Sequence, residues 1–428
     1  MQLVIEPSTA EFEQLAKRPE LEMHDLEKKV LEIFQLVKSN GDEALKDFAK
    51  KFDKAELTDL LVTQVEIQEA EHLISDELKK AIEVAHRNIT LFHATQKTDI
   101  QKIETMPGVV CWRKSVGIEK VGIYIPGGTA PLFSTVLMLA IPATLAGCKE
   151  ITLCSPPNQQ GKIHPAILYA AQRCGVSRII KTGGAQAIAA LTFGTETVSK
   201  AHKIFGPGNQ YVTMAKTLAT RYGVAIDMPA GPSEVLVYAD ETCKPEFVAA
   251  DLLSQAEHGN DSQVILITST QELATSIMNE TEAQLNQLKR FQFASNSLLN
   301  SKAIVMQDRK NVLHFINTYA PEHLILACKQ ANELADEVIN AGSVFIGNYT
   351  PESAGDYASG TNHTLPTNGY AKNYSGVSLD SFVKKITFQE ISKEGLKNIG
   401  PAIECMAEAE ELTAHKNAVS IRLKSLTA

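Results

Sequence analysis

The sequence predicts an α/β protein with two Rossmann-like, doubly wound units, a helical N-terminal arm and a small, mainly helical C-terminal segment. Three observations support this prediction. At 428 residues the chain exceeds the size of one compact core. From residue 121 onward, short apolar runs alternate with helix-like segments, as in parallel sheets that helices cover on both faces. The alternation occurs in two successive series, which predicts two such units.

The first part of the chain has the pattern of helices. Apolar residues recur at helical spacing from Leu26 to Val37, and this stripe stops at Asn40-Gly41 before another opens at Asp42. A third stripe, from Leu78 to Phe92, follows Ser75. Serine is a preferred residue at helix N-caps, so we expect a helix to begin there.

Nine apolar runs are expected to form strands. They are 121–125, 151–154, 178–181, 203–205, 235–238, 264–267, 303–306, 324–327 and 343–346. Helix-like segments such as 131–146 and 164–174 separate them. In folds of this kind, ligands bind near the carboxyl ends of the strands, so we expect the site in a cleft there, between the two units.

Residues 347–376 follow neither a helical nor a strand period and are rich in glycine, asparagine and tyrosine. A long irregular segment inside a compact domain is uncommon, and this composition favours a site loop over a linker. After it, residues 393–425 have a mainly helical pattern. The domain borders that we predict are 1–25 for the arm, 26–120 with 235–375 for the first α/β domain, 121–234 for the second, and 376–428 for the C-terminal segment.

Composition excludes several classes of protein. The net charge of −9 disfavours nucleic acid or an anionic membrane as the main partner, and the hydrophobic fraction of 44% is ordinary for a globular protein. The seven cysteines are scattered without C-x-x-C spacing, which indicates reduced thiols. The N-terminus lacks the pattern of a signal peptide, and no apolar run reaches the length of a membrane span. We therefore expect a cytoplasmic protein.

A candidate general-base pair lies at Glu322 and His323. The helix-like run that ends at Tyr319 is stopped by Pro321, and an apolar strand begins at Leu324. The two ionisable residues therefore occupy a junction between elements, where the backbone can direct both side chains into one cleft. The alternative is a solvated pair at a strand entrance, which is the commoner use of such residues.

Three glycine-rich turns suit a nucleotide. They are 125–131, 182–187 and 206–211, and each follows a predicted strand. Backbone N–H groups at such turns can bind phosphate or ribose, although tight turns use glycine in any case. The third turn begins like G-x-G-x-x-G but has Tyr211 in place of the last glycine. Any dinucleotide is therefore expected to be held in a non-standard way.

A candidate metal site includes Gln255 and His258. The two residues are three apart near the end of a helix that begins close to Pro245, so they lie on one face. The alternative is that His258 only complements the helix dipole. Asp356 and His415 have side chains that could complete a zinc site. Spacing in the sequence does not establish that the four residues converge.

Seven sequence blocks resemble the histidinol dehydrogenase family and follow its order from Val121 to Val419. They are IPGGTAPL (125–132), FGPGNQYV (205–212), MPAGPSE (228–234), SQAEHG (254–259), YAPEHL (319–324), SAGDYASGTNH (353–363) and LTAHKNA (412–418).

This resemblance implies an NAD-dependent enzyme with one Zn²⁺ per subunit. It would oxidise L-histidinol through L-histidinaldehyde to L-histidine, the last steps of histidine biosynthesis. The resemblance assigns proton transfer to Glu322 and His323. It also implies that zinc is bound by Gln255, His258, Asp356 and His415. The substrate would contact these four zinc ligands and also Ser233, His323 and Glu410. NAD would contact Tyr124, Gln186 and Asn209.

The resemblance also implies a homodimer whose C-terminal segment reaches the partner subunit, so that His415 and Glu410 serve the partner's site. The residues around 235–375 would then hold the metal and the catalytic pair, and 121–234 would form the NAD side. The expected chemistry suits the pair, because His323 can take the carbinol proton and Glu322 can activate the water that hydrates the aldehyde.

Two other functions stay open at this point. A cysteine-dependent aldehyde dehydrogenase would use Cys111 or Cys148 to form a thioester. A zinc-dependent binder of small molecules without turnover would retain the metal ligands but would have no use for the Glu322–His323 pair.

Overall fold

The computed structural model describes residues 1–18, 24–127, 131–229 and 231–427. The chain divides into two compact units, one formed by Met1–Thr95 and Ile118–Phe382 and the other by Gln96–Gly117 and Val383–Ala428. Part of the predicted arm, three residues of the first glycine-rich turn, and Ala230 in the block 228–234 lie outside the described residues.

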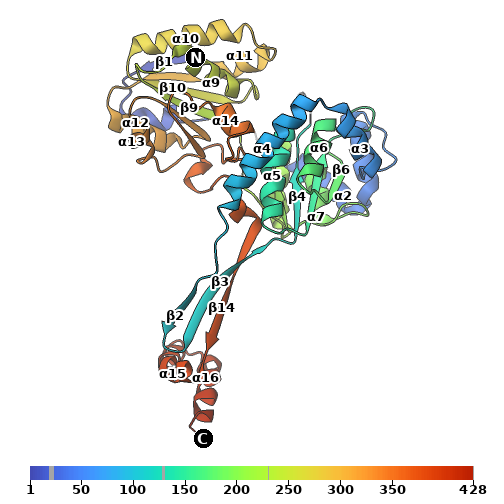
Figure 1. The fold of residues 1–428 in the computed structure, drawn as a ribbon, viewed down its shortest axis with the longest axis vertical. Coiled ribbons are helices and arrows are strands. Elements are labelled where there is room, and N and C mark those ends of the chain that lie inside the picture. The colour runs from blue at the N-terminus through green and yellow to red at the C-terminus, as the bar shows by residue number, and fades with distance from the viewer. Residues whose placement is uncertain (19–23, 128–130, 230, 428) are drawn as a thin grey trace. The chain divides into compact units, whose positions relative to one another are not determined.

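A six-stranded parallel sheet forms the centre of one lobe of the first unit (Figure 1). Alternate side chains of its central strand enter two separate cores, with Val235 and Val237 in one and Leu236 in the other. Because both faces are buried, these strands have continuous apolar runs. In sheet order the strands are β1 (Gln2–Ile5), β11 (Lys302–Val305), β10 (Gln263–Thr268), β9 (Glu234–Ala239), β12 (His323–Ala327) and β13 (Ser343–Ile346).

Helices cover both faces of this sheet. One core is completed by α9 (Pro245–Ala256), α10 (Gln271–Leu285) and α11 (Phe291–Leu299). The other is completed by α1 (Phe12–Leu15), α12 (Arg309–Tyr319) and α13 (Ala331–Ala335). The lobe is therefore doubly wound, as predicted.

A five-stranded parallel sheet forms the second lobe of the same unit (Figure 1). In sheet order its strands are β6 (Arg178–Lys181), β5 (Glu150–Ser155), β4 (Lys120–Tyr124), β7 (Lys203–Phe205) and β8 (Ala225–Ile226). The helices α5 (Phe133–Leu145) and α6 (Pro165–Arg173) pack in one core, and α7 (Gly184–Phe193) and α8 (Gln210–Arg221) in the other.

The two sheets have the same strand order. If β4 to β8 are numbered 1 to 5, their order across the five-stranded sheet is 3-2-1-4-5. If β9 to β13 are numbered in the same way, the six-stranded sheet has the same order, with β1 added at the edge next to β11. This is the order of a Rossmann-type sheet. The predicted fold class, with two Rossmann-like units, is confirmed.

The N-terminal region differs from the prediction in two respects. Residues Gln2–Ile5 form an edge strand beside β11 instead of part of a helical arm. We expected residues 26–120 to join residues 235–375, but α2 (His24–Phe48) packs on α7 and α8 of the five-stranded lobe. In the same lobe α3 (Gln64–Leu73) packs on α6, and α4 (Asp76–Ala94) packs on α5. An amphipathic stripe predicts a buried face but does not identify its partner.

Local signals for these helices are confirmed. Gly41 interrupts α2 with φ 52° and ψ −129°, at the position where the apolar stripe stops. Ser75 caps α4, because its side chain accepts a hydrogen bond from the Leu78 N–H. Both features depend on neighbouring residues only, which is why the sequence predicts them.

The second unit contains a three-stranded antiparallel sheet that the sequence does not predict. Its strands are β14 (Val383–Ile391), β3 (Val109–Gly117) and β2 (Lys102–Met106), and Trp112 stacks on Phe388 across it with ring centroids 5.4 Å apart. Most of these residues are exposed, so no buried face produces an alternating pattern. The helices α15 (Lys393–Ala409) and α16 (Thr413–Ser425) pack on each other, and helical structure was predicted there.

The segment 347–376 is mainly irregular, as predicted. It contains one short helix, α14 (Glu352–Tyr357), and a single turn at Tyr370–Lys372. The segment contacts α5 of the five-stranded lobe, because the Asn362 side-chain amide donates to the Met138 carbonyl at 2.6 Å. It therefore links the two lobes of the first unit.

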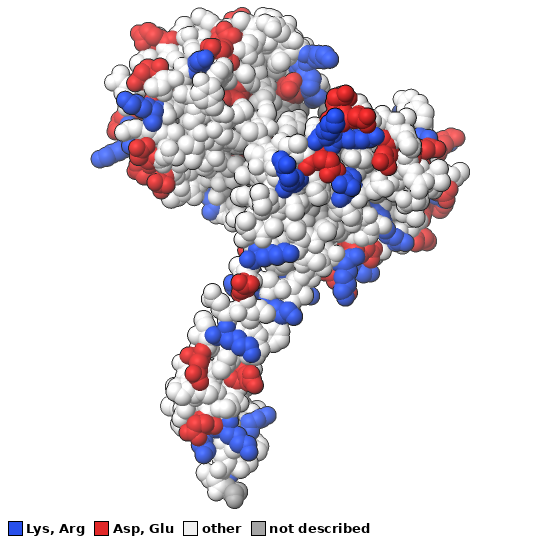
Figure 2. Space-filling view, viewed as in Figure 1, with Lys and Arg blue, Asp and Glu red and all other residues white. Residues whose placement is uncertain are grey.

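On the face shown in Figure 2, Lys and Arg side chains are interspersed with Asp and Glu side chains. Within the described ranges, no helix combines the length and apolar character that a membrane crossing requires.

Candidate active site

Glu322 and His323 lie where the chain turns from α12 into β12. The helix ends at Tyr319, the next residue Ala320 adopts a left-handed conformation with φ 52° and ψ 65°, and Pro321 follows. The turn brings both side chains into the protein interior, where Glu322 is 6% exposed and His323 is 4% exposed. The alternative of a solvated junction pair is therefore excluded.

The surroundings of the pair raise both pKa values. Glu322 Oε2 accepts a hydrogen bond from the Glu234 N–H at 2.9 Å, but burial raises the pKa of Glu322 to about 8. Burial alone lowers the pKa of His323, but the negative charges of Glu352, Glu322 and Asp356 outweigh it and raise the value to about 10. The pair therefore holds protons more firmly than the free side chains do.

The His323 ring lies between two carboxylates. Nδ1 is 3.8 Å from Glu322 Oε2, and Nε2 is 3.5 Å from Asp356 Oδ1. No described residue makes a well-directed hydrogen bond to either ring nitrogen. A buried imidazole of this kind can exchange a proton with a ligand that enters the site.

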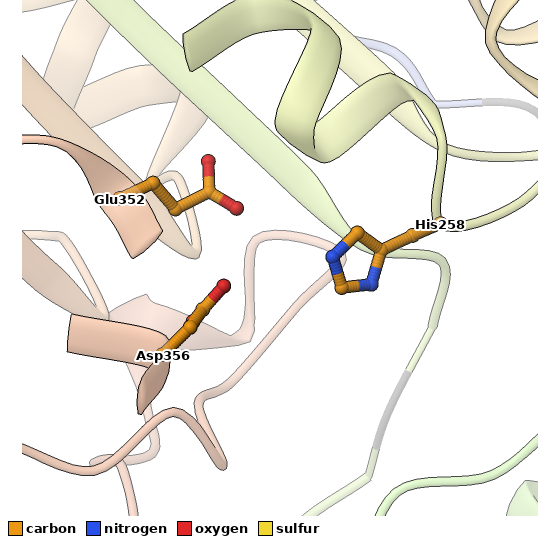
Figure 3. Close-up of side chains that lie close together, drawn as sticks. All are labelled: His258, Glu352 and Asp356. Atoms are coloured by element: carbon orange, nitrogen blue, oxygen red, sulfur yellow. The ribbon is translucent and has the colours of Figure 1, made fainter. Parts of the chain in front are cut away.

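His258, Glu352 and Asp356 form a cluster of metal-type ligands. One potential ligand atom from each residue lies within 4.8 Å of the others. Figure 3 shows the three side chains directed toward a common point, with His258 just past the end of α9 and the two carboxylates on α14. Glu352 and Asp356 are four residues apart, so one face of this short helix presents both.

Gln255 lies behind this cluster in the last turn of α9 and is fully buried. In the amide orientation that satisfies both neighbours, its nitrogen donates to Glu352 Oε1 and its oxygen accepts from the Glu234 N–H at 2.8 Å. Gln255 therefore contacts Glu352, which lies in one cluster with His258 and Asp356.

The charges of this cluster are set by burial and by His323. Burial raises the pKa of Glu352 well above its usual value, and the nearby carboxylates add to that effect. Burial alone would also raise the pKa of Asp356, but its contact with His323 outweighs burial and lowers the value. His258 is exposed, but partial loss of solvent lowers its pKa, which favours the neutral imidazole that binds metals.

The sequence analysis did not single out Glu352 or assign a role to His363. His363 Nδ1 hydrogen-bonds the Asp356 carbonyl at 2.8 Å, and its Nε2 lies 3.0 Å from Thr135 Oγ1 on α5. The signal for Glu352 is its spacing of four residues from Asp356 within a helix. That helix was not predicted, so the signal was not available from the sequence.

These residues gather at the amino ends of the strands. Ser233 directly precedes β9, and His323 begins β12 beside it, paired with Val235 in register. Our expectation of a site at the carboxyl ends is therefore wrong for this cluster. The reason is that the carboxyl ends of α9 and α12 lie at the same edge as the amino ends of the strands that follow them.

Glu410 and His415 belong to the second unit. Glu410 follows the last residue of α15, His415 lies in the first turn of α16, and both side chains are exposed. The cluster in the first unit is thus formed without them.

A cavity of about 1090 Å³ lies at the carboxyl ends of the strands of the five-stranded sheet. Tyr124, Gln186 and Asn209 all line it, although they are far apart in the sequence. The Tyr124 hydroxyl accepts a hydrogen bond from the Gly184 N–H at 3.1 Å, and burial raises the pKa of Tyr124 to about 12. Asn209 Oδ1 caps α8 by accepting from the N–H groups of Tyr211 and Val212.

The residues at the metal-type cluster are of the right kind for zinc. Zinc in proteins binds imidazole nitrogen and carboxylate oxygen, and catalytic sites supply three protein ligands with room for another group. The imidazole of His258 and the carboxylates of Glu352 and Asp356 lie together here, and the Gln255 amide is hydrogen-bonded to Glu352. The donor set therefore fits the metal that the sequence analysis expected.

A buried acid–base pair next to metal-type ligands, on a fold with two Rossmann-type lobes and a cavity of about 1090 Å³, is the arrangement of an enzyme active site. Comparisons with known proteins specify the class further. A profile of the family described as histidinol dehydrogenase matches residues 16–423. A histidinol dehydrogenase of Bacteroides thetaiotaomicron is 61% identical over 426 residues, which cover 100% of both chains.

Two other relatives agree. A histidinol dehydrogenase of Escherichia coli is 52% identical over 416 residues, covering 96% of this chain and 95% of that protein. The crystal structure of histidinol dehydrogenase from Elizabethkingia anophelis is 60% identical with a TM-score of 0.98, and the match covers 100% of this chain and 99% of that one. The chain belongs to the histidinol dehydrogenase family, and it is an oxidoreductase.

Proposed function

We propose that this protein catalyses the zinc- and NAD-dependent oxidation of L-histidinol to L-histidine through L-histidinaldehyde, the last steps of histidine biosynthesis. The observation that supports this most directly is that His323 lies between Glu322 and Asp356, and that Asp356 also lies in the metal-type cluster with His258. Membership of the histidinol dehydrogenase family supports L-histidinol as the substrate. A cytoplasmic location is part of the proposal.

Gln255, His258 and Asp356 would hold the zinc, with His415 of a second subunit as the fourth ligand. When bound, zinc would anchor the imidazole and amine of histidinol and orient its carbinol. The exposed position of Glu410 and His415 in a separate unit supports their use by a partner in a homodimer. Ser233, at the same strand edge as His323, would contact the substrate.

His323 would act as the proton acceptor in both oxidation steps. Its ring nitrogens have no well-directed partner, so one of them is available to the carbinol oxygen. NAD would accept the hydride in each step. Glu322 Oε2 and Asp356 Oδ1 face the two ring nitrogens of His323 at 3.8 and 3.5 Å, so acidic groups are in place to stabilise the proton that the ring takes.

Glu322 would activate the water that converts the aldehyde to its hydrate. Burial raises the pKa of Glu322 to about 8, so its ionised form is a stronger base than a solvated carboxylate. The Glu234 N–H holds one carboxylate oxygen and leaves the other for the water. Tyr124, Gln186 and Asn209 would contact NAD, since all three line one cavity.

The structure gives less support to the two rival functions. Burial raises the pKa of Cys148 to about 11, so it remains a protonated thiol that is poorly suited to thioester formation. Cys111 lies on β3 in the second unit. A binder without turnover would have no need for the Glu322–His323 pair, whose burial is costly.

The deciding experiment measures NADH formed per histidine produced from L-histidinol, before chelation, after chelation and after zinc is restored. We expect two NADH per histidine, loss of turnover on chelation and recovery with zinc. The variant His258→Asn should lose bound zinc, whereas His72→Asn, an exposed histidine on α3, should retain it. No turnover by folded, zinc-loaded dimer would contradict the proposed function.

A further inference from the structure

Asp53 is a carboxylate without a partner on the wall of the large cavity. It ends the helical turn Ala49–Asp53 that follows α2, and it lines the same cavity as Tyr124. None of the described residues forms a hydrogen bond with its buried Oδ2 atom, and no described lysine or arginine lies within 4.0 Å of the carboxylate. Burial raises the pKa of Asp53 to about 6.

A second polar group without a partner lies on the same wall. Ser155 is 1% exposed and lines the cavity, and its hydroxyl contacts no hydrogen-bonding group among the described residues. Buried polar groups are nearly always paired in folded proteins. Two unpaired groups on one cavity wall therefore indicate a ligand that brings hydrogen-bond donors and acceptors of its own.

The topology identifies which part of a ligand belongs here. In a Rossmann-type sheet the acidic residue that binds the adenosine ribose follows the second strand of the first βαβ unit. In this sheet that strand is β5, which ends at Ser155 and continues as Pro156, Pro157 and Asn158. The usual carboxylate is thus missing from its usual position, while Asp53 brings one to the same cavity from the preceding helical segment.

We propose that Asp53 accepts hydrogen bonds from the hydroxyl groups of the adenosine ribose, and that its negative charge excludes a 2′-phosphate and so selects NAD over NADP. A vicinal diol offers two O–H donors to one carboxylate, which matches an aspartate that has no donor of its own. This inference rests on the proposed use of NAD.

A binding experiment tests the assignment directly. ADP and 2′-deoxy-ADP are titrated by calorimetry into the full-length wild-type protein and into Asp53→Asn. Wild type should bind ADP about 10- to 100-fold more tightly than 2′-deoxy-ADP, because a hydroxyl bound to a carboxylate is lost in the latter. The Asp53→Asn variant should lose most of this preference. Equal binding of the two nucleotides by wild type would overturn the proposal, as would equal weakening of both by the substitution.

A kinetic experiment tests selectivity. In Asp53→Asn the ratio of kcat/KM for NAD to that for NADP should fall at least about tenfold, with the KM for histidinol and the zinc content unchanged. Glu32→Gln is the matched control, because Glu32 is an exposed carboxylate that lines the same cavity. An equal fall in both variants would mean that only the general charge of the cavity matters, and would overturn the assignment to Asp53.

The two experiments separate this inference from the proposed function. If wild-type protein binds ADP with the expected preference but does not reduce NAD with histidinol, the proposed function fails and the role of Asp53 stands. If wild type turns over and Asp53→Asn changes neither measurement, the role of Asp53 fails and the proposed function stands.

Discussion

At the scale of single residues, the chemistry of the site depends on burial. Glu322 is an ordinary carboxylate in sequence, but in the folded protein it has one hydrogen-bond donor and little solvent, and its pKa rises to about 8. His323 is held near three carboxylates, which favour its charged form. The two residues are thus made more basic by different causes, the first by loss of water and the second by negative neighbours.

The first prediction separates the roles of this pair. Glu322→Gln should slow oxidation of L-histidinaldehyde about 100-fold or more, because that step needs an activated water, and should slow oxidation of L-histidinol less than about tenfold. The two half-reactions are measured separately by NADH formation in stopped flow. Glu333→Gln, an exposed carboxylate on α13, is the control. Equal losses in both half-reactions would contradict this division of roles.

The second prediction concerns pH and Asp53. The pKa of Asp53 is raised to about 6 in the folded protein, above the value of about 3.9 for an unfolded chain, so the folded state binds this proton more tightly. Its contribution to stability is therefore present below about pH 4 and is lost as the pH rises through about 6.

The direction of this pH dependence can be measured as the difference in melting temperature between the variant and the wild-type protein. Without nucleotide, the Tm of Asp53→Asn minus that of wild type should increase between pH 4 and pH 7, because the variant carries no charge to bury. Thermal melts across this range provide the test, and the same melts with ADP should show a smaller difference. A difference that stays constant with pH would indicate that the Asp53 carboxylate is solvated.

At the scale of elements, strand ends determine where chemistry occurs. In the five-stranded sheet the glycine turn after β7 passes so close to β4 that a Cβ atom on Gly206 would lie 2.2 Å from the Tyr124 carbonyl oxygen. Gly206 also has φ 130°, and its N–H donates to Asp227 at 2.8 Å. The close approach places the turn beside Tyr124 on the cavity wall.

The third prediction compares two glycines with positive φ. Gly206→Ala should destabilise the protein by about 3 kcal/mol or more, because its Cβ would collide with backbone, and should raise the KM for NAD. Gly223→Ala should cost only about 1 to 2 kcal/mol, since φ is 78° but nothing lies within 4 Å of the added Cβ. Denaturant unfolding of both variants gives the comparison, and equal losses would exclude the close approach as the cause.

The N-terminal segment supports the other lobe in a comparable way. Arg18 binds the Glu234 carboxylate through Nε at 2.7 Å and also donates to the Tyr319 carbonyl at 2.6 Å. Glu234 begins β9, and its N–H is the donor to Glu322. A residue near the start of the chain thus stabilises the strand end that holds the candidate base.

At the scale of the whole molecule, the proposed metal site would combine residues of two subunits. Gln255, His258 and Asp356 lie in the first unit, and His415 lies in the second. In a closed dimer each site would combine the first unit of one subunit with the second unit of its partner. This arrangement would explain why one candidate ligand is far from the others in sequence.

The fourth prediction uses mixed dimers. His258→Asn and His415→Asn should each be inactive, but subunit exchange between them should restore about a quarter of wild-type activity, because half of the dimers would be mixed and each would have one intact site. A mixture of His258→Asn with Asp356→Asn is the control and should not recover, since both changes affect the same unit. No recovery in the first mixture, despite proven exchange, would contradict the shared site.

Much of the fold could be predicted because its signals are local. All nine predicted strands exist, and the long runs at β9, β10 and β12 are apolar because helices cover them on both sides. The strands β2, β3 and β14 were missed because they are exposed and have no buried face to impose a period. The assignment of α2, α3 and α4 to the lobe with the six-stranded sheet was incorrect. An amphipathic stripe shows which face of a helix is buried, but it does not show which element covers that face.

By itself, the sequence determined the fold class, the junction that contains Glu322 and His323, and the blocks that relate the chain to its family. These features depend on residues near one another in the chain, or on letters that can be compared directly. Only the tertiary structure decided that the metal-type cluster lies at the amino ends of the strands, that Glu352 belongs to it, that His363 hydrogen-bonds the Asp356 carbonyl, and that Asp53 lines the cavity with Tyr124. Those facts depend on distances between segments far apart in the chain, and on the loss of water around them, which arise only when the chain packs.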